Sequence, residues 1–372
     1  MTLDSLKKLN IAVIGAGYAG ATAAHALRLL GANVTVYEQA QEVKEVGAGI
    51  GLRPSTMEQF RKLGIFDVIK AVTSSSDYFE ILTNDGQRIA MEEWPEKKTF
   101  GVSTHFVHRG DFIQALLSVL SPDMVKLDHH LTRIVDTGSK ARAEFANGVT
   151  IEADLIVGAD GIRSKVRSQL FSDKAPVFAG EHAYRAVIPA ADTFGLVDDG
   201  NLRMYVGRGT KIYLLPLLHR NEVSFDVTSL SADSTPVPVS SKEELLRVVQ
   251  GFDPRLVTIT EGLDMDKVNL RAVYDIDPVE NWHSKSVVLI GDAAHAMCHH
   301  QGQGANSAVL DAGTLADCLA QADSIPEALA RYKAGRKPVT DELQRLSRNG
   351  WSEDEIRTVF PNQHEGELAA RS

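Results

Sequence analysis

The chain has few cysteines, no long apolar run and no excess of positive charge, and each absence excludes a class of protein. Among its 372 residues only Cys298 and Cys318 are cysteines, too few for a disulfide framework, so we expect a reducing, cytoplasmic environment. No apolar run reaches the roughly 18 residues that a membrane-spanning helix needs. Residues 1–10 contain no apolar core of signal-peptide length, so neither a membrane protein nor a secreted one is predicted.

The charge balance argues against two kinds of partner. With 39 Lys and Arg against 49 Asp and Glu, the net charge is −10, which disfavours binding to nucleic acid or to an anionic membrane surface. Apolar residues make up 44% of the chain and charged residues 24%, as in ordinary soluble globular proteins. The length allows two domains that share a large core. We predict no metal site, and the sequence leaves a monomer and a homodimer open.

The first forty residues predict a strand, a glycine turn, a helix and a second strand. Residues 11–14 form a continuous apolar run, as in a strand buried on both faces. Residues 21–30 are rich in good helix formers, and Gly31 ends that run. Residues 33–38 (NVTVYE) then give the second strand. Such a unit closes right-handed into a parallel sheet.

The middle of the chain is richer in strands. Residues 78–94 and 141–157 each predict a hairpin, with turns at Asp85-Gly86 and Asn147-Gly148. Strand-like runs dominate residues 181–282, interrupted by a Pro- and Ser-rich loop and the helical pattern KEELLRVVQGF. A buried strand and a long helical region follow. We therefore predict an α/β fold, a Rossmann-like nucleotide-binding domain with a parallel sheet plus a β-rich substrate-binding domain.

The predicted nucleotide-binding domain is discontinuous in sequence. It comprises residues 1–75, 98–180 and 283–345, and the β-rich domain comprises residues 76–97 and 181–282. Residues 346–372 are predicted as a C-terminal helix and tail.

A glycine fingerprint follows the first strand directly. Gly15, Gly17 and Gly20 fit G-x-G-x-x-G at the start of a helix, where the second glycine lets the backbone approach a pyrophosphate. The helix N-terminus supplies free N–H groups and a positive dipole to phosphates. Glu38 ends the second strand about twenty residues later, where a carboxylate can accept from ribose hydroxyls. The alternative, a tight turn in a plain α/β fold, does not explain Glu38. FAD and NAD proteins share this fingerprint, so it predicts a dinucleotide without naming one.

Three further motifs follow in order, each at the end or edge of a predicted element. They are R-x-D-x-x-x-x-L at 109–116, D-G-x-x-S-x-x-R at 160–167 and G-D-A-A-H…G-Q-G-x-N at 291–306. With the fingerprint and Glu38, they resemble the single-component FAD-dependent aromatic hydroxylases, the salicylate and 6-hydroxynicotinate hydroxylase group. The resemblance spans roughly residues 10–340.

The resemblance implies a set of FAD contacts. Gly15, Gly17, Ala19 and Gly20 would surround the pyrophosphate, and Glu38 and Gln39 would hold the adenosine end. Backbone N–H groups of residues 302–306, where the last motif ends and a helix begins, would face the flavin carbonyl edge and stabilise negative charge on the reduced ring. The other residues that the resemblance assigns to cofactor binding are Gly51, Arg53, Arg109, Leu131, Asp160, Asp292, Gly302, Gly304, Ala305 and Asn306. For Asp160 and Asp292, simple turn or cap chemistry is the alternative.

The reaction implied by the resemblance consumes NADH or NADPH and O₂. NAD(P)H reduces FAD, O₂ adds at C4a of the flavin, and the terminal oxygen of the hydroperoxide passes to an electron-rich ring carbon of an aromatic or N-heteroaromatic substrate. The alternatives are another outcome on the same fold, such as epoxidation, ring-opening oxygenation or inactivation of a polycyclic compound, and a nucleotide-binding module without turnover.

The chain departs from the family pattern at the substrate side of the flavin. His299 stands where the family usually has a proline after His295, and His300 falls where some hydroxypyridine hydroxylases place a histidine. We hypothesise that His299 or His300 is a base or orienter for an ionisable substrate, because imidazole suits that task near neutral pH. The alternative is that both are polar loop residues outside the pocket.

Three more residues are candidates for the catalytic site. Arg53 follows a glycine-rich segment and could bind a substrate carboxylate or a flavin phosphate. Tyr213 could point into the pocket, although an aromatic residue on a strand is more often part of the core. Arg185 could lie over the flavin. For His295 we favour structural support of the flavin loop over direct catalysis.

Overall fold

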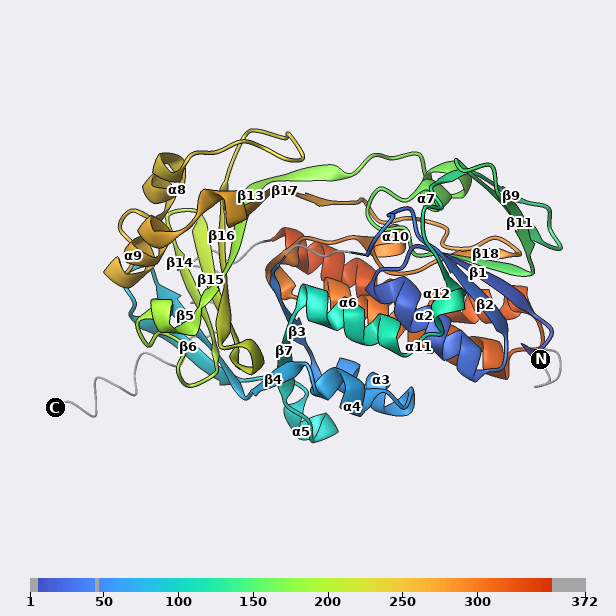
Figure 1. The fold of residues 1–372 in the computed structure, drawn as a ribbon, viewed down its shortest axis with the longest axis horizontal. Coiled ribbons are helices and arrows are strands. Elements are labelled where there is room, and N and C mark those ends of the chain that lie inside the picture. The colour runs from blue at the N-terminus through green and yellow to red at the C-terminus, as the bar shows by residue number, and fades with distance from the viewer. Residues whose placement is uncertain (1–5, 44–46, 350–372) are drawn as a thin grey trace.

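A computed structural model describes residues 6–43 and 47–349. Figure 1 shows two parts, a parallel sheet with its helices on the right and a larger sheet on the left. The parallel sheet has the order β18-β12-β1-β2-β8. Its strands are β1 (Asn10–Ile14), β2 (Asn33–Tyr37), β8 (Val125–Lys126), β12 (Leu155–Gly158) and β18 (Val287–Leu289).

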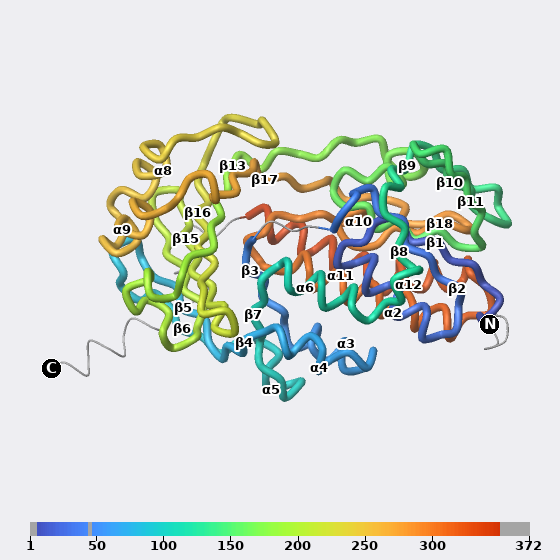
Figure 2. The backbone as a smooth tube through the Cα atoms, viewed as in Figure 1, coloured from blue at the N-terminus to red at the C-terminus, as the bar shows by residue number. Residues whose placement is uncertain are grey.

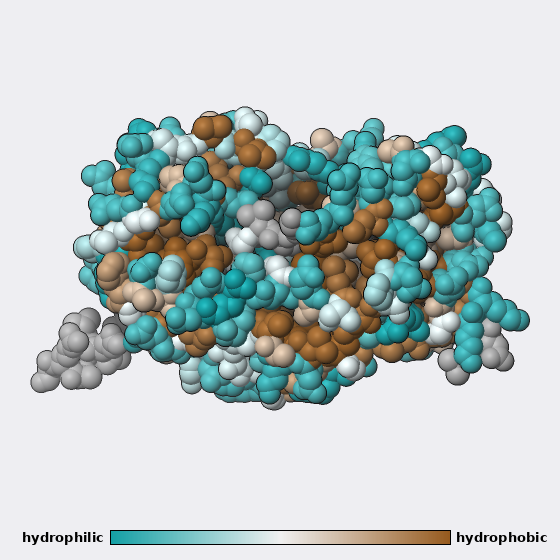
Figure 3. Space-filling model, in the orientation of Figure 1, coloured by the Kyte–Doolittle hydropathy of each residue, from teal (hydrophilic) through white to brown (hydrophobic). Residues whose placement is uncertain are grey.

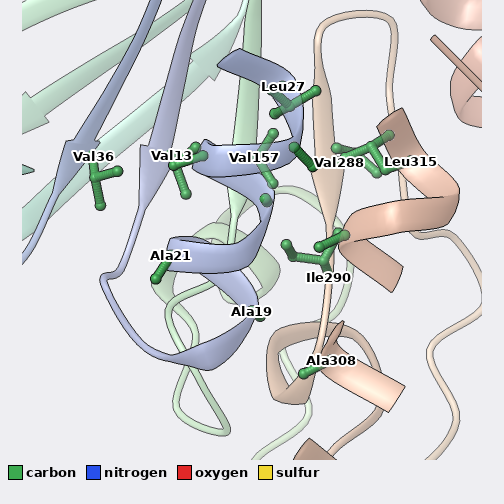
Figure 4. Packing of buried hydrophobic residues seen from close by; sticks show 14 of the residues in the cluster. Val13, Ala19, Ala21, Leu27, Val36, Val157, Val288, Ile290, Ala308 and Leu315 are labelled. Carbon is green, nitrogen blue, oxygen red and sulfur yellow. The ribbon is translucent and has the colours of Figure 1, made fainter. Parts of the chain in front are cut away.

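The parallel sheet is built from segments far apart in the sequence. β1 pairs in parallel with β2 and with β12, and β12 pairs with β18, so residues near 11, 156 and 288 lie side by side. Helices α2 (Tyr18–Leu29) and α11 (Gly304–Gln321) pack on it, and α12 (Ile325–Arg348) packs against α11. Figure 4 shows Val13, Val157 and Val288 of these strands among side chains of both α2 and α11. All residues of β12 and β18 and residues 11–14 of β1 are buried, so the side chains on both faces of these strands are covered, as their continuous apolar runs predict.

Two three-stranded sheets accompany the parallel sheet. The first has the order β11-β10-β9, with β9 (Leu131–Asp136), β10 (Ala141–Phe145) and β11 (Thr150–Ala153). The second has the order β3-β7-β4, with β3 (Gly49–Leu52), β4 (Thr73–Ser76) and β7 (Thr104–His108). β3 and β7 also contact the larger sheet, so the second sheet lies where the two parts of the molecule meet.

The larger sheet has seven strands in the order β17-β13-β16-β15-β14-β5-β6. They are β5 (Tyr78–Thr83), β6 (Arg88–Glu93), β13 (Val177–Pro189), β14 (Leu202–Gly207), β15 (Thr210–Leu217), β16 (Glu222–Leu230) and β17 (Asn269–Asp275). Apolar side chains such as Tyr184, Ile212 and Phe225 form a core on one face with α8 (Lys242–Val249) and α9 (Pro254–Gly262). In Figure 2, β13 and β17 lie side by side where the chain passes between the two parts.

The remaining helices are short. They are α3 (Pro54–Lys62), α4 (Phe66–Lys70), α5 (Lys97–Phe100), α6 (Arg109–Ser118), α7 (Lys165–Leu170) and α10 (Asp292–His295), with 3₁₀ turns at Pro122–Met124, Ala190–Thr193, Leu218–Arg220, Met265–Lys267 and His299–Gln301 (η5). Figure 3 shows polar side chains spread over the whole visible face with apolar ones between them. Within the described ranges no helix is long and apolar enough to span a membrane.

The predicted fold class is confirmed, and so are both hairpins. Gly86 and Gly148 adopt positive φ (89° and 85°) in the turns between β5 and β6 and between β10 and β11. The helix predicted from Lys242 ends at Val249, before Gly251, and α9 was not predicted. The division into two domains stays a prediction, and the tail predicted beyond residue 349 lies outside the described residues.

Candidate active site

The glycine turn after β1 contains two glycines that the chain itself requires. A Cβ on Gly15, whose φ is +103°, would lie 2.4 Å from the Ala159 carbonyl oxygen. A Cβ on Gly20 would lie 1.9 Å from the Gly15 carbonyl oxygen. Both positions therefore exclude a side chain because backbone is packed there. A Cβ on Gly17 would meet no atom within 4 Å. Nothing in the described protein occupies the space beside Gly17, which fits the close approach of a ligand.

The helix that follows this turn, α2, has no side-chain cap at its N-terminus. Gly17 is the N-cap of α2, no side chain accepts from its first N–H groups, and its first turn contains no acidic residue. These donors are free for an anion. Nearby, Glu38 Oε2 accepts from the Ala16 N–H (2.7 Å) and Oε1 accepts from the Ala40 N–H (2.9 Å). These two backbone hydrogen bonds fix the Glu38 carboxylate at the turn. Each carboxylate oxygen still has a lone pair that can accept a hydrogen bond from a hydroxyl group. The amide oxygen of Gln39 lies 3.1 Å from His130 Nδ1.

Asp160 has a clear structural role. Its carboxylate accepts from Ser164 Oγ and from the backbone N–H groups of Lys165 (2.7 Å) and Val166 (3.1 Å) at the start of α7. Burial raises the pKa of Asp160, and these hydrogen bonds oppose the rise. In the same motif, Arg167 donates to the Ala293 carbonyl (3.0 Å), so the 160–167 and 291–306 motifs are joined. The alternative stated for Asp160, cap chemistry, describes its side chain.

Asp292 differs from Asp160 because its carboxylate has no hydrogen-bond partner in the described part of the chain. The side chain is exposed, yet surrounding protein raises its pKa against the attraction of His295, Arg109 and Arg167. Both properties belong to a carboxylate that faces an open recess. Asp292 Oδ1 lies 3.9 Å from where a Cβ of Gly304 would be, at the uncapped start of α11. An unpartnered acceptor and unpartnered N–H donors therefore face the same space.

Arg109 and Tyr18 contact each other beside the glycine turn, at the start of α2. Arg109 Nε donates to Tyr18 Oη (2.8 Å), and the Tyr18 ring stacks on Phe112 with centroids 4.9 Å apart. Tyr18 opens α2 and Arg109 opens α6, so two helix starts meet here. His108 is the residue that caps α6, and Asp111 in the first turn of that helix pairs with Arg220 (2.9 Å).

Asn306 fixes the start of α11 to β3. Its amide nitrogen donates to the carbonyls of Gly51 (2.9 Å) and Gly302 (2.8 Å), and its oxygen accepts from the Arg53 N–H (2.8 Å) and Thr56 Oγ1 (2.7 Å). Every hydrogen-bonding position that a primary amide offers is thus used by the protein. The side chain of Asn306 positions the site, while Gly302, Gly304 and Ala305 supply backbone there.

A buried cluster of charged side chains stabilises the turn at Gly291, which precedes α10. Asp311 on α11 accepts from the Gly291 N–H (2.9 Å) and Arg336 Nε (2.7 Å), and it bonds His295 Nε2 (2.6 Å). Asp311 and His295 are fully buried. Burial alone would raise the pKa of Asp311, but the charges of and hydrogen bonds from His295 and Arg336 outweigh it and lower the pKa to about 2. His295 therefore supports the loop.

The face of the seven-stranded sheet opposite α8 and α9 carries polar side chains in register. Tyr213 lies beside Asp226, and Asp226 lies beside Arg185, in one row across β15, β16 and β13. Arg185 Nε donates to Asp226 Oδ2 (2.7 Å). Tyr213 Oη is buried and has no hydrogen-bond partner among the described residues. Burial and then the charge of Asp226 raise the pKa of Tyr213, so its hydroxyl stays a donor.

Both η5 histidines are tied to this polar face. His300 Nε2 lies 2.6 Å from Glu181 Oε2, and Lys211 Nζ donates to Glu181 Oε1 (2.9 Å). Burial would raise the pKa of Glu181, but His300 and Lys211 lower it to about 2. His299 Nε2 lies 2.9 Å from Thr228 Oγ1. The structure thus brings His299, His300, Tyr213 and Arg185 together, and their catalytic role stays a prediction.

Arg53 lies at the edge of this arrangement. Its guanidinium stacks over Trp94, with Cζ 4.4 Å from the ring centroid, and forms no hydrogen bond or ion pair within the described ranges. Burial lowers its pKa to about 10, partly opposed by Glu96, so it stays charged at neutral pH. A partly buried cation with five unused donors is suited to an anionic group.

Sequence reasoning did not identify four residues of the polar face. They are Glu181, Lys211, Asp226 and Thr228. Each alternates with apolar residues along a strand that the composition predicted, and this alternation with a period of two could have assigned them to the polar face. Leu131, which the resemblance assigns to cofactor binding, is buried in the main core at the start of β9.

The residues present fit an FAD molecule. Gly17 and Asp292 follow the carboxyl ends of β1 and β18, two strands of one parallel sheet, and Asp292 lies beside Gly304 at the start of α11. Pyrophosphate suits the first helix start, and a hydroxylated chain suits the carboxylate.

Comparisons with known proteins agree with this geometry. Residues 8–347 match a family model described as "FAD binding domain". The chain is 32% identical over 362 residues to 6-hydroxynicotinate 3-monooxygenase of Pseudomonas fluorescens, covering 92% of this chain and 91% of that protein. It is 31% identical over 346 residues to 3-amino-4-hydroxybenzoate 2-monooxygenase of Streptomyces cremeus, covering 92% and 86%. The structure of Klebsiella pneumoniae HpxO complexed with FAD and uric acid superposes with a TM-score of 0.83 at 23% identity, covering 95% and 90%.

Proposed function

The chain belongs to the FAD-binding-domain family of FAD-dependent aromatic monooxygenases, and from this premise we propose that it hydroxylates a small activated aromatic or N-heteroaromatic acid with NAD(P)H and O₂. The observation that carries the proposal is the polar face of the seven-stranded sheet, with its unpaired Tyr213 Oη, set against the loop that opens α11. Residues 6–43 and 47–349 contain no separate nicotinamide-binding domain that can be recognised, so NAD(P)H is proposed to visit the flavin transiently.

The cofactor side is assigned from the described contacts. Gly17 and the start of α2 would hold the pyrophosphate, Glu38 the adenosine ribose, and Asp292 the ribityl hydroxyls. The start of α11 would face the isoalloxazine ring. Bound FAD supplies the redox and oxygen-transfer chemistry, and the protein orients the substrate and excludes water.

The substrate side uses residues from both parts of the chain. Tyr213 would donate to an oxygen or ring nitrogen of the substrate. Arg53 would bind a carboxylate, and the hydroxybenzoates and hydroxynicotinate in the relatives' names carry such a group. Arg185 is neutralised by Asp226, so we assign it to shaping the pocket.

The test is a screen of substituted benzoates and hydroxypyridines with the purified holoenzyme. A substrate should stimulate NADH or NADPH oxidation and give one hydroxylated product for each O₂ consumed. Cleavage of the ring or an epoxide as product would instead favour another outcome on this fold. Failure of every compound to stimulate NAD(P)H oxidation, in a protein that binds FAD, would contradict the proposal.

Replacing Tyr213 by phenylalanine is expected to lower kcat/KM for hydroxylation by about ten- to a hundredfold, the value of one hydrogen bond to a charged group. FAD affinity should not change, because Tyr213 lies on the substrate side. Tyr205→Phe is the matched control, since Tyr205 lies on the opposite face of the sheet. Steady-state kinetics with a compound found in the screen measures the effect; equal losses in both variants would contradict the role of Tyr213.

Replacing Arg53 by glutamine is expected to raise KM about tenfold or more for a substrate that carries a carboxylate, and to change it little for the analogue without one. Arg61→Gln is the control, because Arg61 also stacks on an aromatic ring, Phe66, but is half-exposed. Equal effects on both substrates would show that Arg53 does not bind the carboxylate.

A further inference from the structure

The hydrogen bonds around His299 run in one direction, and this fixes which ring nitrogen is free. Asp226 accepts from Arg185 Nε (2.7 Å) and from Thr228 Oγ1 (3.0 Å). A threonine hydroxyl has a single hydrogen. Because Thr228 uses that hydrogen toward Asp226, its oxygen must accept from His299 Nε2, 2.9 Å away.

His299 therefore carries its proton on Nε2 when neutral, and Nδ1 bears the lone pair. No hydrogen bond in the described part of the chain occupies Nδ1. The His299 ring lies 6.2 Å from the Tyr213 ring between centroids, so the ring that bears Nδ1 neighbours the ring that bears the unpaired Tyr213 Oη. One unpaired acceptor and one unpaired donor thus meet at the proposed substrate site.

The surroundings keep His299 neutral. Burial, and then the charges of Arg185 and His300, hold its pKa well below the ordinary 6.5. The titratable and charged groups around it are Arg185 and Glu181 on β13, Lys211 and Tyr213 on β15, Asp226 on β16 and the adjacent His300. A second proton would place a third positive charge beside Arg185 and Lys211. His299 is therefore suited to accept a hydrogen bond and unsuited to take the proton.

We infer that His299 Nδ1 is a fixed hydrogen-bond acceptor that selects substrates presenting an O–H or N–H at this position, and that Thr228 and Asp226 are positioning residues that set its tautomer. The inference rests on the proposed function and refines it. The sequence left His299 and His300 equivalent as bases. In the structure Thr228 engages His299 Nε2 and Glu181 engages His300 Nε2, and His300 Nδ1 is buried without a partner among the described residues. We assign the substrate-facing acceptor to His299 because its ring is the neighbour of the Tyr213 ring. Ethers, which lack the hydrogen, would be rejected because Nδ1 would be left unpaired.

The tautomer can be read without turnover. In ¹⁵N-histidine-labelled holoenzyme, long-range ¹H–¹⁵N spectra should show the His299 ring with hydrogen on Nε2 and a bare Nδ1 from pH 8 to pH 5.5, assigned by its loss in His299→Gln. Thr228→Val removes the acceptor hydroxyl and should yield the other tautomer or a mixture, whereas Thr228→Ser should restore the original pattern. Thr260→Val, which removes a buried hydroxyl on α9, is the control.

Selectivity is measured with two ligand pairs, 6-hydroxynicotinate against 6-methoxynicotinate and 3-amino-4-hydroxybenzoate against 3-amino-4-methoxybenzoate. In the parent enzyme the hydroxyl compound of at least one pair should bind ten- to a hundredfold more tightly, followed by the change in flavin absorbance. Thr228→Val and Asp226→Asn should reduce that ratio at least fivefold, and Thr228→Ser should keep it. If Thr228→Val does not fold, Asp226→Asn carries the same test.

The outcomes separate the inference from the proposed function. A bare Nδ1 that moves in Thr228→Val supports the tautomer assignment even if no compound is hydroxylated. A His299 ring protonated on both nitrogens at pH 6, a tautomer unchanged in Thr228→Val, or an unchanged hydroxyl-to-methoxy ratio in both variants would overturn the inference, whether or not the enzyme hydroxylates its substrate.

Discussion

Replacing Gly17 by alanine is expected to weaken FAD binding on the order of a hundredfold or more. A Cβ at this position meets no protein atom within 4 Å, and the φ of −69° suits alanine, so the apoprotein should fold as before. The methyl group would occupy the space that the pyrophosphate needs against the start of α2. Losing about two charged hydrogen bonds there costs roughly 3–6 kcal/mol.

The measurement is a titration of stripped apoprotein with FAD, followed by quenching of flavin fluorescence, beside a thermal melt without FAD. Gly335→Ala is the matched control, because Gly335 lies within α12 and a Cβ there also meets open space. It should bind FAD normally and gain about 0.5–1 kcal/mol of stability. If Gly17→Ala binds FAD as tightly as Gly335→Ala, the pyrophosphate does not lie at this turn.

Replacing Asp311 by alanine is expected to lower the free energy of unfolding by about 3–5 kcal/mol. The substitution leaves the buried Arg336 without its carboxylate and the Gly291 N–H without its acceptor. Glu342→Gln is the control, since Glu342 and Arg345 form an exposed pair on α12, the helix that carries Arg336, and it should leave the free energy of unfolding nearly unchanged. Urea unfolding of both variants measures the difference, and similar losses would show that the buried cluster contributes little.

The same cluster predicts acid sensitivity. The folded-state pKa of Asp311 is about 2, below the ordinary 3.8, so its contribution is fully present above pH 4 and is lost as the pH falls from about 4 to about 2. In the parent protein the free energy of unfolding should decline by about 2 kcal/mol over that interval through this group alone. In Asp311→Asn that part of the decline should be absent, which parallel unfolding curves at pH 4 and pH 2 would reveal.

The sequence predicted the parallel sheet and the cofactor side because those signals are local. Gly15, Gly17 and Gly20 stand within six residues of one another, and a buried strand such as Ile11–Ile14 can be recognised from its own composition. The order of four such motifs then identified the family, which the comparisons confirm.

The substrate side could not be predicted in the same way because its contacts join distant segments. Glu181 and His300 are 119 residues apart, and Thr228 and His299 are 71 apart. The sequence pointed to both histidines but not to their partners, since which strand neighbours η5 depends on the packing of the seven-stranded sheet. The tautomer of His299 follows only from the Asp226–Thr228 bond, which no local pattern reveals.

The parallel sheet joins β1, near residue 10, to β18, near residue 288, and its turn is secured by Asp311 and Arg336. During synthesis, the glycine turn therefore leaves the ribosome long before the strand and helices that complete its surroundings. Cofactor loading must wait until residues up to about 336 have been made and folded back, although N-terminal segments usually fold first. A nascent chain stalled before β18 would expose the apolar edge of β12 and would have no site for the flavin.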